Sequence, residues 1–161
     1  MNVITRDILK LVASIIACQC AGLIGSIFTI PSIPTWYASL QKPPFTPPNW
    51  LFAPAWITLY LLMGIAAFII WRRGLDKPGI KTALIIFLVQ LILNALWSVV
   101  FFGFKSPFSG VVVIVVLWIA ILFTILKFFK ISKAAGLLLL PYILWVTFAA
   151  ALTISVWILN P

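Results

Sequence analysis

Residues 36–60 read WYASLQKPPFTPPNWLFAPAWITLY, and this stretch lies between two long apolar runs. It holds five prolines, three tryptophans and a single charged residue, Lys42. The prolines at 43, 44, 47 and 48 lack a backbone N–H and fix φ, so no regular helix or sheet passes through them. An aromatic segment without regular structure must pack on something. We therefore expect its proline-rich part, residues 41–50, to act as a lid at the mouth of a helical bundle, over a binding site.

The composition indicates a membrane protein. The chain has 161 residues, of which 65% are hydrophobic and 8% charged, and it has no histidine. A water-soluble domain needs more polar surface than this, so lipid is the expected solvent for much of the chain. The net charge is +9. Because the Lys and Arg residues lie at the ends of the apolar runs, they indicate topology signals and lipid headgroup contacts, with no nucleic-acid partner.

Five apolar runs are long enough to cross a bilayer as helices, which takes about 20 residues each. Their backbone polar groups must be paired within lipid, and a helix achieves this within one segment. The sequence therefore predicts an all-α membrane protein, a five-transmembrane-helix bundle forming a single domain over residues 1–161. The expected helices cover about 8–30, 50–71, 83–102, 108–126 and 134–159, with a Pro/Trp-rich loop over 31–49.

The positive charges predict the orientation of this multi-pass protein. Nine of them fall on one expected side of the membrane, at Arg6, Lys10, Arg72, Arg73, Lys77, Lys81, Lys127, Lys130 and Lys133. Only Lys42 and Lys105 fall on the other side. The positive-inside rule then predicts a cytoplasmic N-terminus and an outside C-terminus. If the cell is prokaryotic, we expect the protein in the cell membrane.

The first span repeats small residues at every fourth position. The row is Ala13, Ala17, Ala21 and Gly25, with Ser14, Cys18, Gly22 and Ser26 beside it. Small residues at this spacing let helix backbones approach closely in lipid. Packing within the chain explains the row, and so does a subunit interface.

Aromatic and amide side chains share faces on three other spans. Trp56 and Tyr60 share a face of the second span, as do Asn94 and Trp97 on the third. Tyr142, Trp145 and Ala149 share a face of the fifth span, with Phe148 on its flank. Uncharged amides in lipid normally face the bundle interior, where they bond to a neighbouring helix or to a ligand. The faces indicate a lined cavity, although plain core packing also explains them.

Missing residue types narrow the chemistry. No span contains Asp, Glu or His apart from Asp7 at one edge, and Cys18 and Cys20 point to different sides of a helix. We therefore expect no metal site, no catalytic residue and no required cofactor, and an axial histidine for haem is impossible. What remains is stacking, shape and a few hydrogen bonds, which suit a flat or bulky apolar ligand.

Several motifs resemble the TspO/MBR family, the tryptophan-rich sensory proteins that include the mitochondrial translocator protein. They are Gly22, Gly25 and Ser26, WYxxLxKPxFxPPxW at 36–50, PxWxxLY at 54–60, LNxxW at 93–97, FFG at 101–103 and PYxxWxxFA at 141–149. The resemblance implies five transmembrane helices, a homodimer and a pocket beneath the first loop. It also implies porphyrin ligands such as protoporphyrin IX and haem, synthetic benzodiazepine-type ligands and, in animals, cholesterol.

The leading hypothesis is thus a membrane receptor or sensor that binds porphyrins and related apolar ligands. The alternatives are a porphyrin or sterol transporter, and a light-dependent porphyrin-degrading protein in which tryptophans matching Trp56 and Trp145 take part; whether the protein is an enzyme stays open. We expect Asn94 or Lys42 to meet a porphyrin propionate. The candidate ligand-binding residues are Trp36, Lys42, Pro47, Trp50, Trp56, Tyr60, Asn94, Trp97, Tyr142, Trp145, Phe148 and Ala149.

Two positions depart from the family pattern. Many members carry an acidic residue in the fourth span where this chain has Val113, which weakens any transport mechanism that depends on that carboxylate. Many also carry asparagine in the fifth span where this chain has Thr153, which changes a possible hydrogen bond without removing the polar group.

Overall fold

The computed structural model describes residues 2–161, which form helices joined by connectors, with no strand. Five segments are long and apolar enough to cross a membrane, as the sequence predicts. The elements are α1 (Val3–Ser32), the π-helix η1 (Ile33–Tyr37), the 3₁₀ turn η2 (Asn49–Leu51), α2 (Phe52–Trp71), α3 (Ile80–Ser98), the π-helix η3 (Val99–Gly103), α4 (Pro107–Ile131), α5 (Lys133–Leu138) and α6 (Leu140–Leu159).

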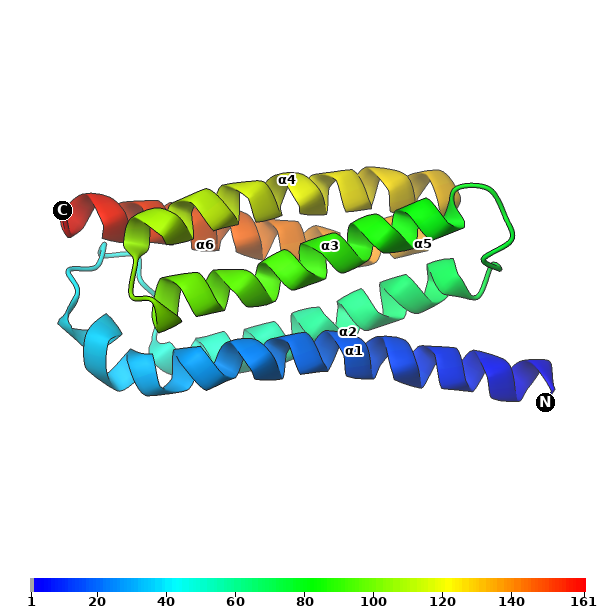
Figure 1. Ribbon diagram of the computed structural model, residues 1–161, viewed down its shortest axis with the longest axis horizontal. Coiled ribbons are helices and arrows are strands. Elements are labelled where there is room, and N and C mark those ends of the chain that lie inside the picture. Colours follow the sequence, from blue (N-terminus) through cyan, green and yellow to red (C-terminus); the bar gives the residue numbers. More distant parts are fainter. Residues whose placement is uncertain (1) are drawn as a thin grey trace.

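The five spans run side by side along one long axis (Figure 1). α1 lies against α2 and α3, α3 pairs with α4, and α4 pairs with α6, while the contact between α2 and α6 is slight. The N-terminus, the α2–α3 connector and the α4–α5 junction lie at one end of the bundle, which we call the basic end (Figure 1). The α1–α2 connector and the C-terminus lie at the other, which we call the loop end.

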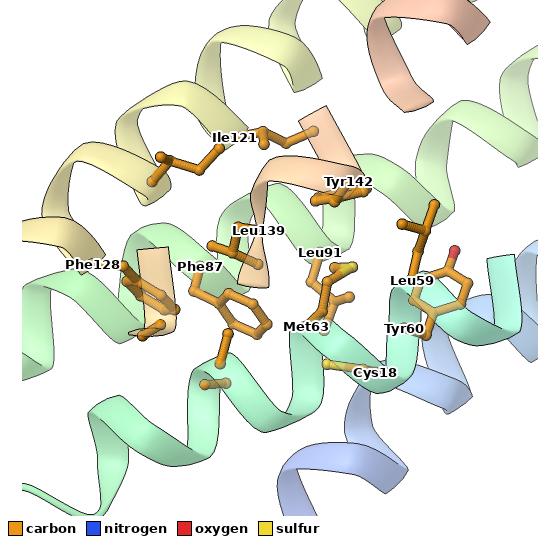
Figure 2. Packing of buried hydrophobic residues seen from close by; sticks show 14 of the residues in the cluster. Cys18, Leu59, Tyr60, Met63, Phe87, Leu91, Ile121, Phe128, Leu139 and Tyr142 are labelled. Atoms are coloured by element: carbon orange, nitrogen blue, oxygen red, sulfur yellow. The ribbon is translucent and has the colours of Figure 1, made fainter. Parts of the chain in front are cut away.

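The core fills the middle of the bundle and its basic end. Met63, Ile121 and Tyr142 are fully buried, and Figure 2 shows them gathered from α2, α4 and α6. Phe87 of α3 stacks on Phe128 of α4 with ring centroids 5.7 Å apart. This packing closes the basic end of the bundle, so any internal space lies toward the loop end.

The prediction of a loop over residues 31–49 is wrong for its first part. The first span stays helical through Tyr37, although it contains Pro31 and Pro34. Proline removes one intrahelical hydrogen bond, and a π turn accommodates this by widening the helix locally. The Thr35 hydroxyl also donates to the Pro31 carbonyl at 2.7 Å. The connector without helix is therefore confined to residues 40–48.

Other helix bounds also differ from the prediction: the first span begins at Val3 and not near residue 8, and α3 begins at Ile80 and not near residue 83. α4 continues past the expected end near residue 126 to Ile131, because Phe128 is fully buried and extends the packed face beyond Lys127. The fifth span is interrupted at Leu139 and so forms two helices. Pro141 explains the break, since it has no N–H to donate to a carbonyl of the preceding turn.

The small residues of α1 pack within the chain. The buried row is Ser14, Cys18, Ala21 and Gly25, whereas Ala13 and Ala17 are exposed. α2 approaches this row closely: a Cβ added at Gly64 would lie 2.7 Å from Ile15 Cα. Intramolecular packing therefore accounts for the buried row, and a subunit interface on the exposed side stays a prediction.

Candidate functional site

A cavity of about 360 Å³ lies inside the loop-end half of the bundle. Side chains from α1 and η1, η2 and α2, α3 and η3, and α6 line it, and none of these is charged. Small-molecule sites are typically clefts of about 300–1,000 Å³ with mostly apolar walls. We call this space the loop-end cavity.

Aromatic pairs form its walls. Trp56 stacks on Tyr60 of the same helix, with ring centroids 5.5 Å apart and an interplanar angle of 28°. Trp97 stacks on Phe101, with centroids 5.3 Å apart and an angle of 13°. Stacking of this kind holds each indole in one orientation. The cavity therefore presents flat aromatic surfaces from more than one helix.

A buried hydrogen-bond network lies next to the cavity, on the side toward the basic end. The Tyr60 hydroxyl donates to Asn94 Oδ1, Asn94 Nδ2 donates to the Tyr142 hydroxyl at 2.9 Å, and that hydroxyl donates to Gln90 Oε1 at 2.8 Å. The network links α2, α3 and α6. Of its members only Tyr60 lines the cavity. Asn94 and Gln90 therefore bond to neighbouring helices, one of the two roles expected for amides in lipid.

The connector at the loop end is fastened by polar contacts. Lys42 Nζ donates to the carbonyls of Tyr37 and Leu40 at 2.8 and 2.9 Å, and it lies 5.0 Å from the centroid of the Tyr37 ring. The backbone N–H of Gln41 donates to Asn160 Oδ1 at 3.0 Å, and Asn160 Nδ2 donates to the Gln41 carbonyl at 2.9 Å. The connector is thus tied both to the end of the first span and to the C-terminus.

The structure brings half of the predicted site residues together at the cavity. Those that line it are Trp56, Tyr60, Trp97, Trp145, Phe148 and Ala149. Asn94 and Tyr142 lie beneath it in the network, and Lys42 and Pro47 belong to the connector. Of the segment expected to act as a lid, residues 41–50, only Asn49 lines the cavity.

Trp36 and Trp50 lie apart from this group. Trp36 packs against Phe101 and Phe102, with ring centroids 5.4 and 6.5 Å away, whereas Trp50 is 72% exposed. Neither lines the cavity. For all twelve candidate residues, contact with a ligand stays a prediction.

Several lining residues were not among the candidates. Gly22 belongs to them, and a Cβ added there would lie 2.5 Å from Tyr60 Cε2. Phe101 of the FFG motif also lines the cavity, as does Gln19, which donates to the Ile57 carbonyl at 3.1 Å. The Gly22 and FFG motifs were visible in the sequence, but nothing there showed that they face the same space as Trp56.

The two departures from the family pattern fall in different places. Thr153 lines the cavity, and its hydroxyl donates to the Ala149 carbonyl at 2.8 Å. Val113 lies on α4 and outside the lining. Within residues 2–161 no group of three His, Cys, Asp or Glu residues is placed to hold a metal ion.

Known proteins match nearly the whole chain. The sequence profile of the TspO/MBR family matches residues 14–158. The chain is 50% identical over 155 residues to the tryptophan-rich protein TspO of Archaeoglobus fulgidus, which covers 96% of this chain and 99% of that protein. It is 38% identical to the tryptophan-rich sensory protein of Cereibacter sphaeroides (78% and 77% covered) and 33% identical to the human translocator protein (83% and 80% covered).

Proposed function

Since the chain belongs to the TspO/MBR family of sensory and translocator proteins, we propose that it binds porphyrins and related apolar ligands in the loop-end cavity. It is an integral, multi-pass membrane protein in contact with lipid. Protoporphyrin IX and haem are the proposed ligands, a homodimer is the proposed assembly, and no cofactor takes part in the proposal.

The observation that supports this proposal most is the uncharged aromatic lining. The Trp56–Tyr60 pair on α2, the Trp97–Phe101 pair and Trp145 on α6 offer flat surfaces to a flat ligand. Each good aromatic contact contributes about 0.5–1.5 kcal/mol beyond the area that it buries. A macrocycle fits such surfaces better than a flexible chain does, because stacking needs a rigid plane.

The propionates of a porphyrin need a different environment. Among residues 2–161 no charged side chain lines the cavity. The Asn94 side chain is 3% exposed, and its amide is already hydrogen-bonded to Tyr60 and Tyr142. Lys42 would have to release its bonds to the Tyr37 and Leu40 carbonyls to meet a carboxylate. We therefore expect the propionates to stay hydrated at the loop end while the macrocycle enters the cavity.

Titration with protoporphyrin IX in detergent tests the proposal. Tryptophan fluorescence should be quenched with saturation, and Trp56→Ala with Trp145→Ala should raise Kd by about tenfold or more, since each 1.4 kcal/mol is a decade. Trp157→Ala on the outer surface of α6 is the matched control, and its Kd should stay that of the wild type. A folded double variant with unchanged Kd would place the porphyrin elsewhere.

A second candidate function is movement of porphyrins or sterols across the membrane. The cavity contains no charged group that would couple transport to protons or ions, so the movement would be facilitated passage. Uptake of protoporphyrin IX into liposomes that contain the protein measures it. Uptake equal to that of protein-free liposomes would exclude this function.

The third candidate is light-dependent porphyrin degradation, for which both Trp56 and Trp145 are in the cavity lining. Loss of the porphyrin Soret band in light but not in darkness would support it. Trp145→Phe keeps most of the apolar area, so it should retain binding while slowing the loss of the band. A stable Soret band under illumination would exclude degradation, and binding would then be the only activity toward the porphyrin.

A further inference from the structure

We propose that ligands reach the loop-end cavity sideways from the bilayer, through an opening between α1 and the first half of α2. The proposal rests on the proposed function, because it takes the cavity as the ligand site. The opening is bordered by Leu23 and Ile30 on α1 and by Ala53 and Ile57 on α2, all of which line the cavity. The proposal therefore concerns ligands whose apolar part lies in lipid before they bind.

Exposure of the lining residues locates the opening. Leu23, Ile30 and Ile57 line the cavity and are nevertheless 65%, 68% and 59% exposed on the outside of the bundle. The other exposed lining residues are Ala53 on α2 and Asn49 at the loop end. Among residues 2–161, no lining residue on α3, η3 or α6 is exposed. The cavity therefore reaches the outside along the α1–α2 side.

This opening lies at the depth of the hydrocarbon layer. Ile57 is eight residues from the start of its span at Asn49, about 12 Å at 1.5 Å per residue. Leu23 is 14 residues from the end of the first span at Tyr37, about 21 Å. The hydrocarbon core is about 30 Å thick, so both face acyl chains. The apolar part of a ligand can therefore enter from the acyl chains without crossing water, while polar ends such as propionates stay at the hydrated loop end.

Local packing explains why α1 and α2 part at this level. Toward the basic end they touch closely, at Gly64 and Ile15. One turn further toward the loop end, the Gln19 amide donates to the Ile57 carbonyl. Beyond it α1 leans on α3, since a Cβ at Gly25 would lie 2.9 Å from Ser98 Oγ. The Tyr60 ring is the part of α2 that still approaches α1 there, at Gly22, and the small residues on the inner side of α1 leave a gap between it and the start of α2.

The loop end is the more costly entrance. An incoming ligand would have to displace the paired amides of Gln41 and Asn160 and the carbonyl contacts of Lys42. It would also separate Phe45 from Phe148, whose ring centroids are 6.2 Å apart. At the side opening the bordering side chains are aliphatic and part by rotamer changes, and the polar contact to be broken there is the hydrogen bond of Gln19 to the Ile57 carbonyl. The lateral route therefore has the lower barrier.

Stopped-flow binding of protoporphyrin IX to the protein in lipid nanodiscs tests the route, with porphyrin fluorescence as the signal. Leu23→Phe with Ile57→Phe narrows the opening, so association and dissociation rates should both fall by about tenfold while Kd changes little, as expected for a gate. Leu23→Ala with Ile57→Ala widens it, so both rates should rise. The matched control is Ile16→Phe with Leu61→Phe, the same change on exposed positions of the same helices outside the cavity.

Asn160→Ala tests the alternative route through the loop end, because it removes both hydrogen bonds between the connector and the C-terminus. Lateral entry predicts wild-type rates in this variant. The proposal is overturned if Asn160→Ala speeds binding while neither opening variant changes the rates. Absence of equilibrium binding in the wild type would refute the proposed function itself, and the route with it. Normal Kd with rates insensitive to the opening refutes the route alone.

Discussion

Asn94→Leu should weaken the whole bundle, because Asn94 is the centre of the network beneath the cavity. Its Oδ1 accepts from Tyr60 on α2 and its Nδ2 donates to Tyr142 on α6, so the change removes both interhelical hydrogen bonds. Leucine has a similar volume, which keeps the cavity term small. The Tyr60 hydroxyl loses its partner, and the Tyr142 hydroxyl keeps only Gln90.

The magnitude follows from hydrogen bonds measured inside other membrane bundles. Such bonds average about 0.6 kcal/mol and reach about 1.7 kcal/mol. Two of them give an expected loss of about 1–3 kcal/mol in the free energy of unfolding, in line with the cost of leaving buried polar groups without partners. Reversible unfolding in mixed micelles measures it. The exposed Asn49 offers a matched control, and Asn49→Leu should change stability by less than about 0.5 kcal/mol.

A double-mutant cycle with Tyr60→Phe isolates the direct bond. Tyr60→Phe removes the hydroxyl and keeps the ring, so it should cost stability in the wild type and little in the Asn94→Leu background. A coupling energy of about 0.5 kcal/mol or more is expected for residues in one hydrogen-bond network. Fully additive changes, or a loss under about 0.5 kcal/mol for Asn94→Leu, would refute the reasoning that this network holds α2, α3 and α6 together.

Three further predictions concern the close helix contacts and the orientation. Gly64→Ala places a Cβ 2.7 Å from Ile15 Cα and should destabilise the bundle by about 1–3 kcal/mol in the same unfolding assay; an unchanged midpoint would contradict it. Gly22→Ala pushes the Tyr60 ring into the cavity, so the Kd for protoporphyrin IX should rise by about tenfold, and wild-type affinity in the folded variant would count against the site. In a background without Cys18 and Cys20, Lys77→Cys should resist an impermeant maleimide added outside intact cells while Gln41→Cys reacts; the reverse pattern would invert the orientation.

The sequence alone determined the number of spans. Each apolar run is long enough to cross lipid, and lipid admits only backbones that pair their own polar groups, so the runs had to be helices. Proline positions were less decisive. Pro31 and Pro34 are accommodated within the first span, whereas Pro141 interrupts the fifth. The position of a proline shows which backbone hydrogen bond is missing, but the packing around it decides whether the helix continues.

Only the tertiary structure decided which way each helix faces. In water the buried face of a helix is marked by its apolar residues, but these spans are apolar all round: on α2 the buried Leu59 and the exposed Ile57 are alike in hydrophobicity. Aromatic side chains are equally ambiguous, since Trp56 lines the cavity and Trp36 packs outside it. Because lipid is as apolar as the core, the rotation and neighbours of each helix depend on close packing and on a few interhelical hydrogen bonds, and both exist only in the assembled bundle.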